Sequence, residues 1–114
     1  MTTEQEAEPD VQSGSDNVFA DLRLPSAGED LIKANIAMAI SATIAKRKLT
    51  QVAAGALIGV DQAKVSALLR GRLSGFSVER LLSFLVKLGR DVEITISREH
   101  RKREGRVRVK ADAA

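Results

Sequence analysis

The sequence contains no cysteine, tryptophan or tyrosine, and only one histidine among its 114 residues. The lack of cysteine excludes disulfides and thiolate metal sites, and it fits a reducing compartment. No apolar run approaches the roughly 18 residues of a membrane span, and no signal peptide begins the chain. These absences predict one small domain with flexible ends, located in the cytoplasm.

Recognisable catalytic chemistry is also missing from the sequence. His100 lies among basic residues and has no partner at a catalytic spacing. No phosphate-binding loop, zinc cluster or nucleophile motif is present. The carboxylates after residue 30 are scattered, often at expected helix starts, where capping explains them. We therefore expect no enzyme activity, no metal and no cofactor.

The net charge of +3 conceals a strong asymmetry along the chain. Residues 1–30 hold eight acids and one base, a balance of −7, whereas residues 31–114 hold 17 bases and 7 acids, a balance of +10. A strongly basic folded part is what binding to phosphates requires, although many solvated surfaces are also basic.

The segment at residues 50–71, TQVAAGALIGVDQAKVSALLRG, predicts two short helices joined by a tight turn. The first helix is expected over Gln51–Ile58, with Thr50 as an N-cap whose side-chain oxygen accepts from a free amide. Gly59 suits the left-handed residue that ends a helix, because glycine has no Cβ.

The second helix of this pair is expected over Gln62–Arg70. Asp61 can cap its start and Gly71 can end it. The apolar Val60 lies in the turn, which suggests that it fills the space between the two helices.

The second helix presents two different faces at about 100° per residue. The side expected to face the core carries Val65, Leu68 and Leu69. The opposite side is polar, broken only by methyl groups, and consists of Gln62, Ser66 and Arg70 with Ala63 and Ala67 beside them. A helix that reads DNA in the major groove needs this arrangement.

An ordinary helical hairpin is the simpler alternative. Gly55 argues against it, because this small residue lies where two helices of a helix-turn-helix cross closely, at a cost of about 1 kcal/mol in helix propensity. The joint placement of Gly55, Gly59 and Val60 with Val65 and Leu69 favours a DNA-binding hairpin.

Two further helices flank this hairpin. The first, Glu29–Lys48, carries isoleucine at every fourth position, and Ser77 caps the second, which runs to about Leu88. Before them, residues 1–17 are expected to be a disordered acidic tail, and Val18–Pro25 to dock on the core or to bind a partner.

The hydrophobic period changes after the last expected helix. Val92, Ile94 and Ile96 alternate with polar residues, which predicts a half-buried strand. Its partner could be the run RVRVK at 106–110 or the same strand of a second chain. The basic tail 98–114 fits either phosphate contact or a solvated loop equally well.

The motif TQ-x-x-A-G-x-L-I-G-V-D-Q-x-K-V-S-x-L-L-R-G resembles the Cro/C1 (XRE) helix-turn-helix family. The segments NVFADLRLP, GFSVERLLSFLVKLGRDVEI and EGRVRV extend the resemblance to one branch, the HigA-like antitoxins. The resemblance implies an all-α, five-helix, lambda-repressor-like domain over residues 18–97, followed by a C-terminal β-strand or hairpin. It also implies a homodimer on operator DNA that represses its own operon and neutralises a RelE/HigB-like ribonuclease toxin.

The same resemblance assigns roles to individual residues. Gln51 should contact a phosphate and Gln62 should read a base, while Ser66 and Arg70 follow on the same face and Lys64 lies at its flank. Ala67 departs from the arginine that this branch often has, so one DNA contact is missing here.

Two other functions fit the same residues. One is an XRE-type regulator without a toxin partner, and the other is a protein-interaction module that has lost DNA binding. The dimer contact is expected from the helix starting at Ser77 or from the 92–96 strand. The acidic N-terminal residues are expected to meet the basic toxin.

Overall fold

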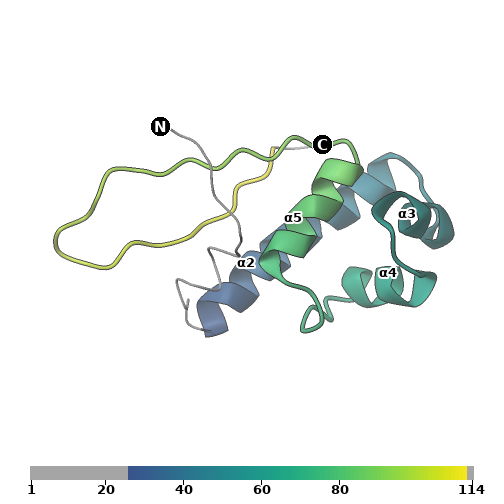
Figure 1. Ribbon diagram of the computed structural model, residues 1–114, viewed down its shortest axis with the longest axis horizontal. Helices are drawn as coiled ribbons and strands as arrows, with labels where there is room; N and C mark the ends of the chain where they lie inside the picture. The colour runs from purple at the N-terminus through teal and green to yellow at the C-terminus, as the bar shows by residue number, and fades with distance from the viewer. Residues whose placement is uncertain (1–25, 113–114) are drawn as a thin grey trace.

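The computed structural model of the protein describes residues 26–112, which form four helices (Figure 1). They are α2 (Ser26–Lys46), α3 (Gln51–Ile58), α4 (Gln62–Leu69) and α5 (Val78–Lys87). The all-α class and the bounds of α3 are confirmed, and the other helices differ from the prediction by a few residues at their ends. The expected tail at residues 1–17 and the docking segment at 18–25 lie outside the described residues.

Side-chain caps explain where three of the helices begin. Each capping residue has an extended backbone, and its oxygen accepts a hydrogen bond from the amide three residues ahead. The pairs are Thr50 with Ala53 at 3.0 Å, Asp61 with Lys64 at 2.9 Å and Ser77 with Arg80 at 3.1 Å. These caps were predicted from the sequence, and each satisfies an amide that has no partner within its helix.

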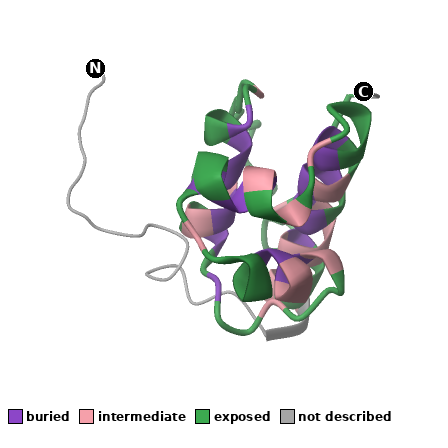
Figure 2. Ribbon diagram, turned by 90° about the vertical axis from the view of Figure 1, so that its right-hand side faces the viewer, coloured by how far each residue is buried: buried purple, intermediate pink, exposed green. Residues whose placement is uncertain are grey.

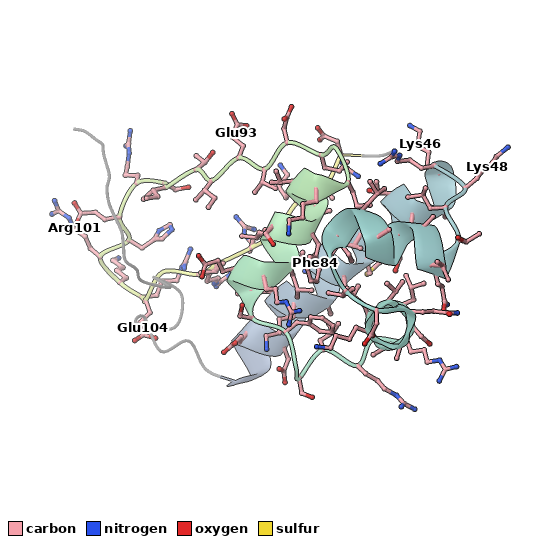
Figure 3. The ribbon with its side chains drawn as sticks, turned by 45° about the vertical axis from the view of Figure 1, so that its right-hand side comes forward. Lys46, Lys48, Phe84, Glu93, Arg101 and Glu104 are labelled. Carbon is pink, nitrogen blue, oxygen red and sulfur yellow. The ribbon has the colours of Figure 1, made fainter. Side chains whose placement is uncertain are left out.

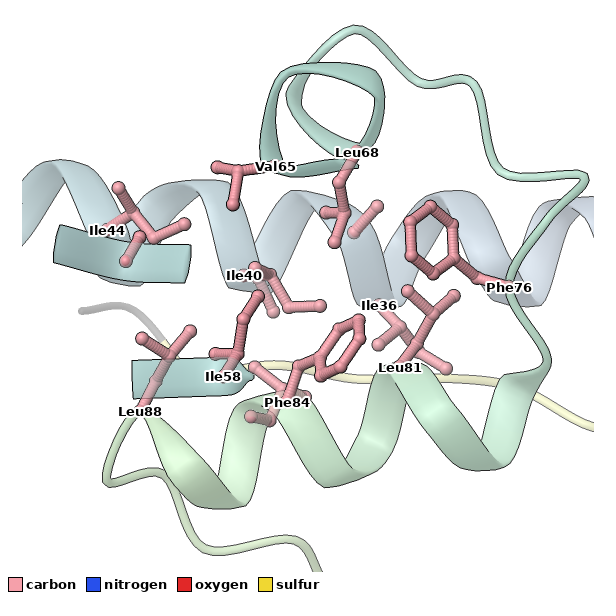
Figure 4. Packing of buried hydrophobic residues seen from close by; sticks show 14 of the residues in the cluster. Ile36, Ile40, Ile44, Ile58, Val65, Leu68, Phe76, Leu81, Phe84 and Leu88 are labelled. Atoms are coloured by element: carbon pink, nitrogen blue, oxygen red, sulfur yellow. The ribbon is translucent and has the colours of Figure 1, made fainter. Parts of the chain in front are cut away.

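One hydrophobic core joins all four helices (Figure 4). The isoleucines of α2 pack against α4 and α5, and Ile58 enters from α3. The largest fully buried side chains are Phe84, Ile36, Ile40, Ile58, Leu68, Leu81 and Val65. The helix-turn-helix is therefore held on a scaffold made by α2 and α5.

Polar bonds to two arginines fasten the ends of α2 and α5. Thr43 is buried, donates to the carbonyl of Ala39 at 2.8 Å and accepts from Arg90 Nη1 at 2.9 Å. Arg47 Nη1 donates to the carbonyl of Leu88 at 3.1 Å. Because a buried hydroxyl needs partners, these bonds fix the relation of the two helices.

The expected C-terminal strand is wrong, and so is the total of five helices, since residues 26–112 hold four helices and no strand. Residues 91–112 instead form two arms of a wide loop (Figure 1). Val92, Ile94 and Ile96 are 36%, 65% and 91% exposed, so no apolar layer covers them. A strand also needs backbone partners, and these arms do not pair.

The run RVRVK at 106–110 uses its alternation differently. Val107 and Val109 are half-buried against the core, while Arg106, Arg108 and Lys110 are exposed. The period-two pattern therefore reflects an extended segment that packs on helices, which alternation alone cannot tell from a sheet strand.

Within residues 26–112, no single helix has the length and apolar character to cross a membrane. The α3–α4 pair passes that test by length and composition alone, as two segments bent by 103°.

Candidate nucleic-acid interface

Helices α3 and α4 form a compact, angled pair on one side of the molecule (Figures 1 and 2). The chain turns by 103° between them, within the range of about 90–120° found in helix-turn-helix motifs. Val65 and Leu68 of α4 are buried beneath the pair. The motif is thus backed by the core on one side and open to solvent on the other.

The backbone at Gly55 explains how the two helices come so close. An added Cβ at this position would lie 2.5 Å from the carbonyl oxygen of Val60 and 3.3 Å from Cγ2 of Val65. The carbonyl of Gly55 accepts hydrogen bonds from the amides of Gly59 at 2.8 Å and Val60 at 3.0 Å. A larger residue would therefore push the turn away from α3.

The turn itself uses two of the residues singled out in the sequence. Gly59 has φ of +83°, a left-handed conformation that few residues with a Cβ adopt. Val60 is half-buried against the core, as is Leu69 at the end of α4. The structure thus places Gly59, Val60, Val65 and Leu69 around the junction of the helices.

The outer face of α4 carries the expected DNA-contacting side chains. Gln62, Lys64 and Arg70 are exposed, and Ser66 is half-buried. Ala63 and Ala67 lie between them and add only methyl groups to the surface. A helix with so little side-chain bulk can approach the edges of bases closely in the major groove.

Gln51 and Gln62 meet across the turn. Gln62 Nε2 donates to Gln51 Oε1 at 3.3 Å, although the two residues start different helices. The contact leaves one amide face of each side chain free. Sequence reasoning proposed the two residues separately and missed this bond. The only available signal was that glutamine begins both helices.

The sequence also gave no indication of one base near the turn. Lys87, at the end of α5, has its ammonium 3.9 Å from the position that a Cβ on Gly59 would occupy. Lys46 and Lys48 point outward at the end of α2 (Figure 3). Arg47, between them, is instead committed to the Leu88 carbonyl. Their location depends on packing between helices that are distant in sequence.

Negative charge is scarce on this side of the molecule. Asp61 is the only acid between residues 50 and 70, and one of its oxygens caps α4. No cluster of three or more His, Asp or Glu side chains among residues 26–112 is arranged to hold a metal ion. The charges around α3 and α4 therefore favour a polyanion.

Comparisons with known proteins agree with this geometry. A family model described as a helix-turn-helix domain matches residues 18–97. A solved structure named "Putative XRE Family Transcriptional Regulator" is 45% identical, with a TM-score of 0.71. That match covers 77% of this chain and 100% of the other. None of the curated proteins matches the chain.

The fold and the site define a helix-turn-helix protein. The chain belongs to the XRE helix-turn-helix family.

Proposed function

We propose that the protein is a sequence-specific DNA-binding regulator that acts as an antitoxin. The outer face of α4 carries this proposal, because its polar side chains surround two alanines and its opposite side is fixed in the core. A helix supported in this way can enter the major groove without deforming the domain. The matching regulator supports the regulatory role.

Each side chain on this surface has a proposed role. Gln62 reads a base, with adenine as the preferred partner because its major-groove edge offers one donor and one acceptor. Gln51 contacts a phosphate and also orients Gln62 through their 3.3 Å bond. Ser66, Lys64 and Arg70 supply the remaining contacts along the groove.

A single helix of this length reads only a few base pairs. We therefore propose a two-fold dimer on an inverted repeat, with half-site centres about 34 Å apart, which is one turn of DNA. Footprinting of the DNA upstream of the gene should show a palindromic protected region. A monomer bound at full affinity to one asymmetric half-site would contradict the proposed dimer.

A binding assay tests the site on α4. Arg70→Ala should weaken binding to the upstream DNA, and Arg103→Ala serves as a matched control because Arg103 lies in the distant loop and bonds there to His100 and Glu104. Equal binding by the two variants and the unmodified protein would reject this surface as the DNA site.

The antitoxin role rests on a different observation. The order of the segments NVFADLRLP, GFSVERLLSFLVKLGRDVEI and EGRVRV around the helix-turn-helix resembles HigA-like antitoxins. The −7 balance of residues 1–30 complements a basic RelE/HigB-like ribonuclease, so we assign the toxin contact to that acidic segment.

Co-expression tests the antitoxin role. The neighbouring reading frame should encode a small basic protein that stops growth when expressed alone and is harmless with this protein. A charge-neutralised variant of residues 4–16 should protect less while keeping its affinity for the operator. Full operator binding without any toxic neighbour would instead support an XRE regulator that has no toxin partner.

A further inference from the structure

The side of α2 that faces away from the core is apolar and uncharged. Leu31 and Met38 are 62% and 69% exposed there, which is unusual for large apolar side chains on one helix. No charged residue occurs between Lys33 and Lys46. We name as the outer face of α2 the residues Leu31, Asn35, Met38, Ala42 and Ala45.

The residues of this face are spaced alternately by four and three positions. This spacing forms a straight seam along a helix and is typical of helices that pair side by side. The seam from Leu31 to Ala45 is about 21 Å long at 1.5 Å per residue. It is long enough for a helix-to-helix contact.

The spacing is also nearly symmetric about Met38. If a second copy of α2 packs on this face in the opposite direction, Leu31 lies opposite Ala45 of that copy and Met38 lies opposite its own equivalent. Large side chains then face small ones at both ends of the seam, so the surface is complementary to itself, as a two-fold interface requires.

The charges at the two ends of α2 select the antiparallel direction. The helix begins with Glu29 and Asp30, and it ends with Lys46 and the adjacent Lys48, which point away from the molecule (Figure 3). An antiparallel second copy brings its basic end to this acidic end, and the two helix dipoles oppose one another. A parallel copy would place like charges together.

A shallow depression of about 280 Å³ adjoins Met38. It is lined by Asn35, Ala39 and Ala42 of α2 and by Val109 and Ala111 of the C-terminal segment. A methionine side chain is flexible and apolar, so the second copy's Met38 can fill an irregular hollow of this kind. The depression thus gives the centre of the seam a place to interlock.

We infer that the outer face of α2 pairs antiparallel with the same face of a second copy of this chain. The inference rests on the proposed two-fold binding of DNA and assigns its dimer contact to α2. Because α4 and α5 pack on the opposite, core-facing side of α2, this contact leaves the outer face of α4 uncovered.

Sedimentation of the full chain without DNA tests the inference. The unmodified protein should dimerise, and Met38→Glu should raise the dimer dissociation constant about tenfold or more, because two carboxylates would meet at the two-fold axis. Ile96→Glu is the matched control, since Ile96 is 91% exposed in the C-terminal loop, and it should leave the dimer unchanged.

A charge exchange supplies a second, independent readout. Asp30→Lys should weaken the dimer, and adding Lys48→Glu should restore it, provided that circular dichroism shows each variant folded. A monomeric unmodified protein, a Met38→Glu variant that dimerises normally, or a dimer broken by Ile96→Glu would overturn the inference. A dimer through another face that still protects an inverted repeat would leave the proposed DNA binding intact.

Discussion

At the scale of single residues, the helix-turn-helix depends on an atom that is absent and on an amide that is shared. The absent atom is the Cβ of Gly55, and the shared amide contact joins Gln51 and Gln62. The first controls how closely two helices pack, and the second links a phosphate contact to a base contact. The two features therefore separate stability from recognition.

Gly55→Ala should destabilise the domain. Alanine raises helix propensity by about 1 kcal/mol, but its Cβ would meet the Val60 carbonyl oxygen, and such overpacking costs about 1–3 kcal/mol. We expect a net loss of stability in thermal unfolding. Gly75→Ala is the control, because an added Cβ there meets nothing within 4 Å. An equal melting temperature for Gly55→Ala and the unmodified protein would disprove the close-approach argument.

Gln62→Ala should relax sequence specificity at one position of each half-site by about 1–3 kcal/mol. Gln51→Ala should weaken binding more evenly across DNA sequences, with a smaller loss of specificity because Gln62 loses its orienting partner. Competition binding against single-base variants of the operator measures both effects. The base-reading role is wrong if Gln62→Ala discriminates those variants as the unmodified protein does.

At the scale of elements, short helices depend on their ends. Helices α3 and α4 have only eight residues each, a length that is not stable in isolation. Their caps and their packing on α2 and α5 therefore set their stability. Asp61 has a particular position, because it caps α4 and is also the only acid between residues 50 and 70.

Substitutions at Asp61 can separate its cap from its charge. Asp61→Ala should cost about 0.5–2 kcal/mol of stability, whereas Asp61→Asn should keep most of the cap. Both variants remove a negative charge beside the proposed DNA surface, so both should bind DNA more tightly at low salt. Chemical denaturation and salt-dependent binding measure the two effects. Equal stability of the Ala and Asn variants would show that the cap contributes little.

At the scale of the whole molecule, the positive charges lie at two separate ends. Lys46 and Lys48 lie at the end of α2 nearest α3, whereas Arg101 belongs to the tip of the C-terminal loop at the opposite end (Figure 3). The longest dimension of the molecule is 45 Å, several times the roughly 8 Å over which salt leaves charges coupled. The two groups of bases therefore cannot be treated as one surface.

This separation predicts different salt dependences for operator binding. Lys48→Ala should lower the slope of log K against log salt by about 0.9 for the phosphate contact that is lost. A triple variant with alanine at residues 101–103 should leave the slope nearly unchanged, although it removes three charges. A larger change from the triple variant would show that the loop touches DNA and would favour phosphate contact over solvation for the basic tail.

The sequence alone determined the local features of this protein. The caps at Thr50, Asp61 and Ser77 and the left-handed Gly59 are set by residues within one helical turn, so the bounds of α3 could be predicted without error. Isoleucine at every fourth position was also enough to identify α2 as a core helix. These features require no knowledge of distant contacts.

Tertiary structure decided the rest. The alternation of Val92, Ile94 and Ile96 predicted a strand, but a strand exists only where another segment supplies backbone partners, and residues 106–110 pack on the helices instead. Packing also brought Lys87 to the turn and placed the basic loop at the far end of the molecule. Contacts between residues distant in sequence depend on how whole helices pack, and no short window of sequence contains that information.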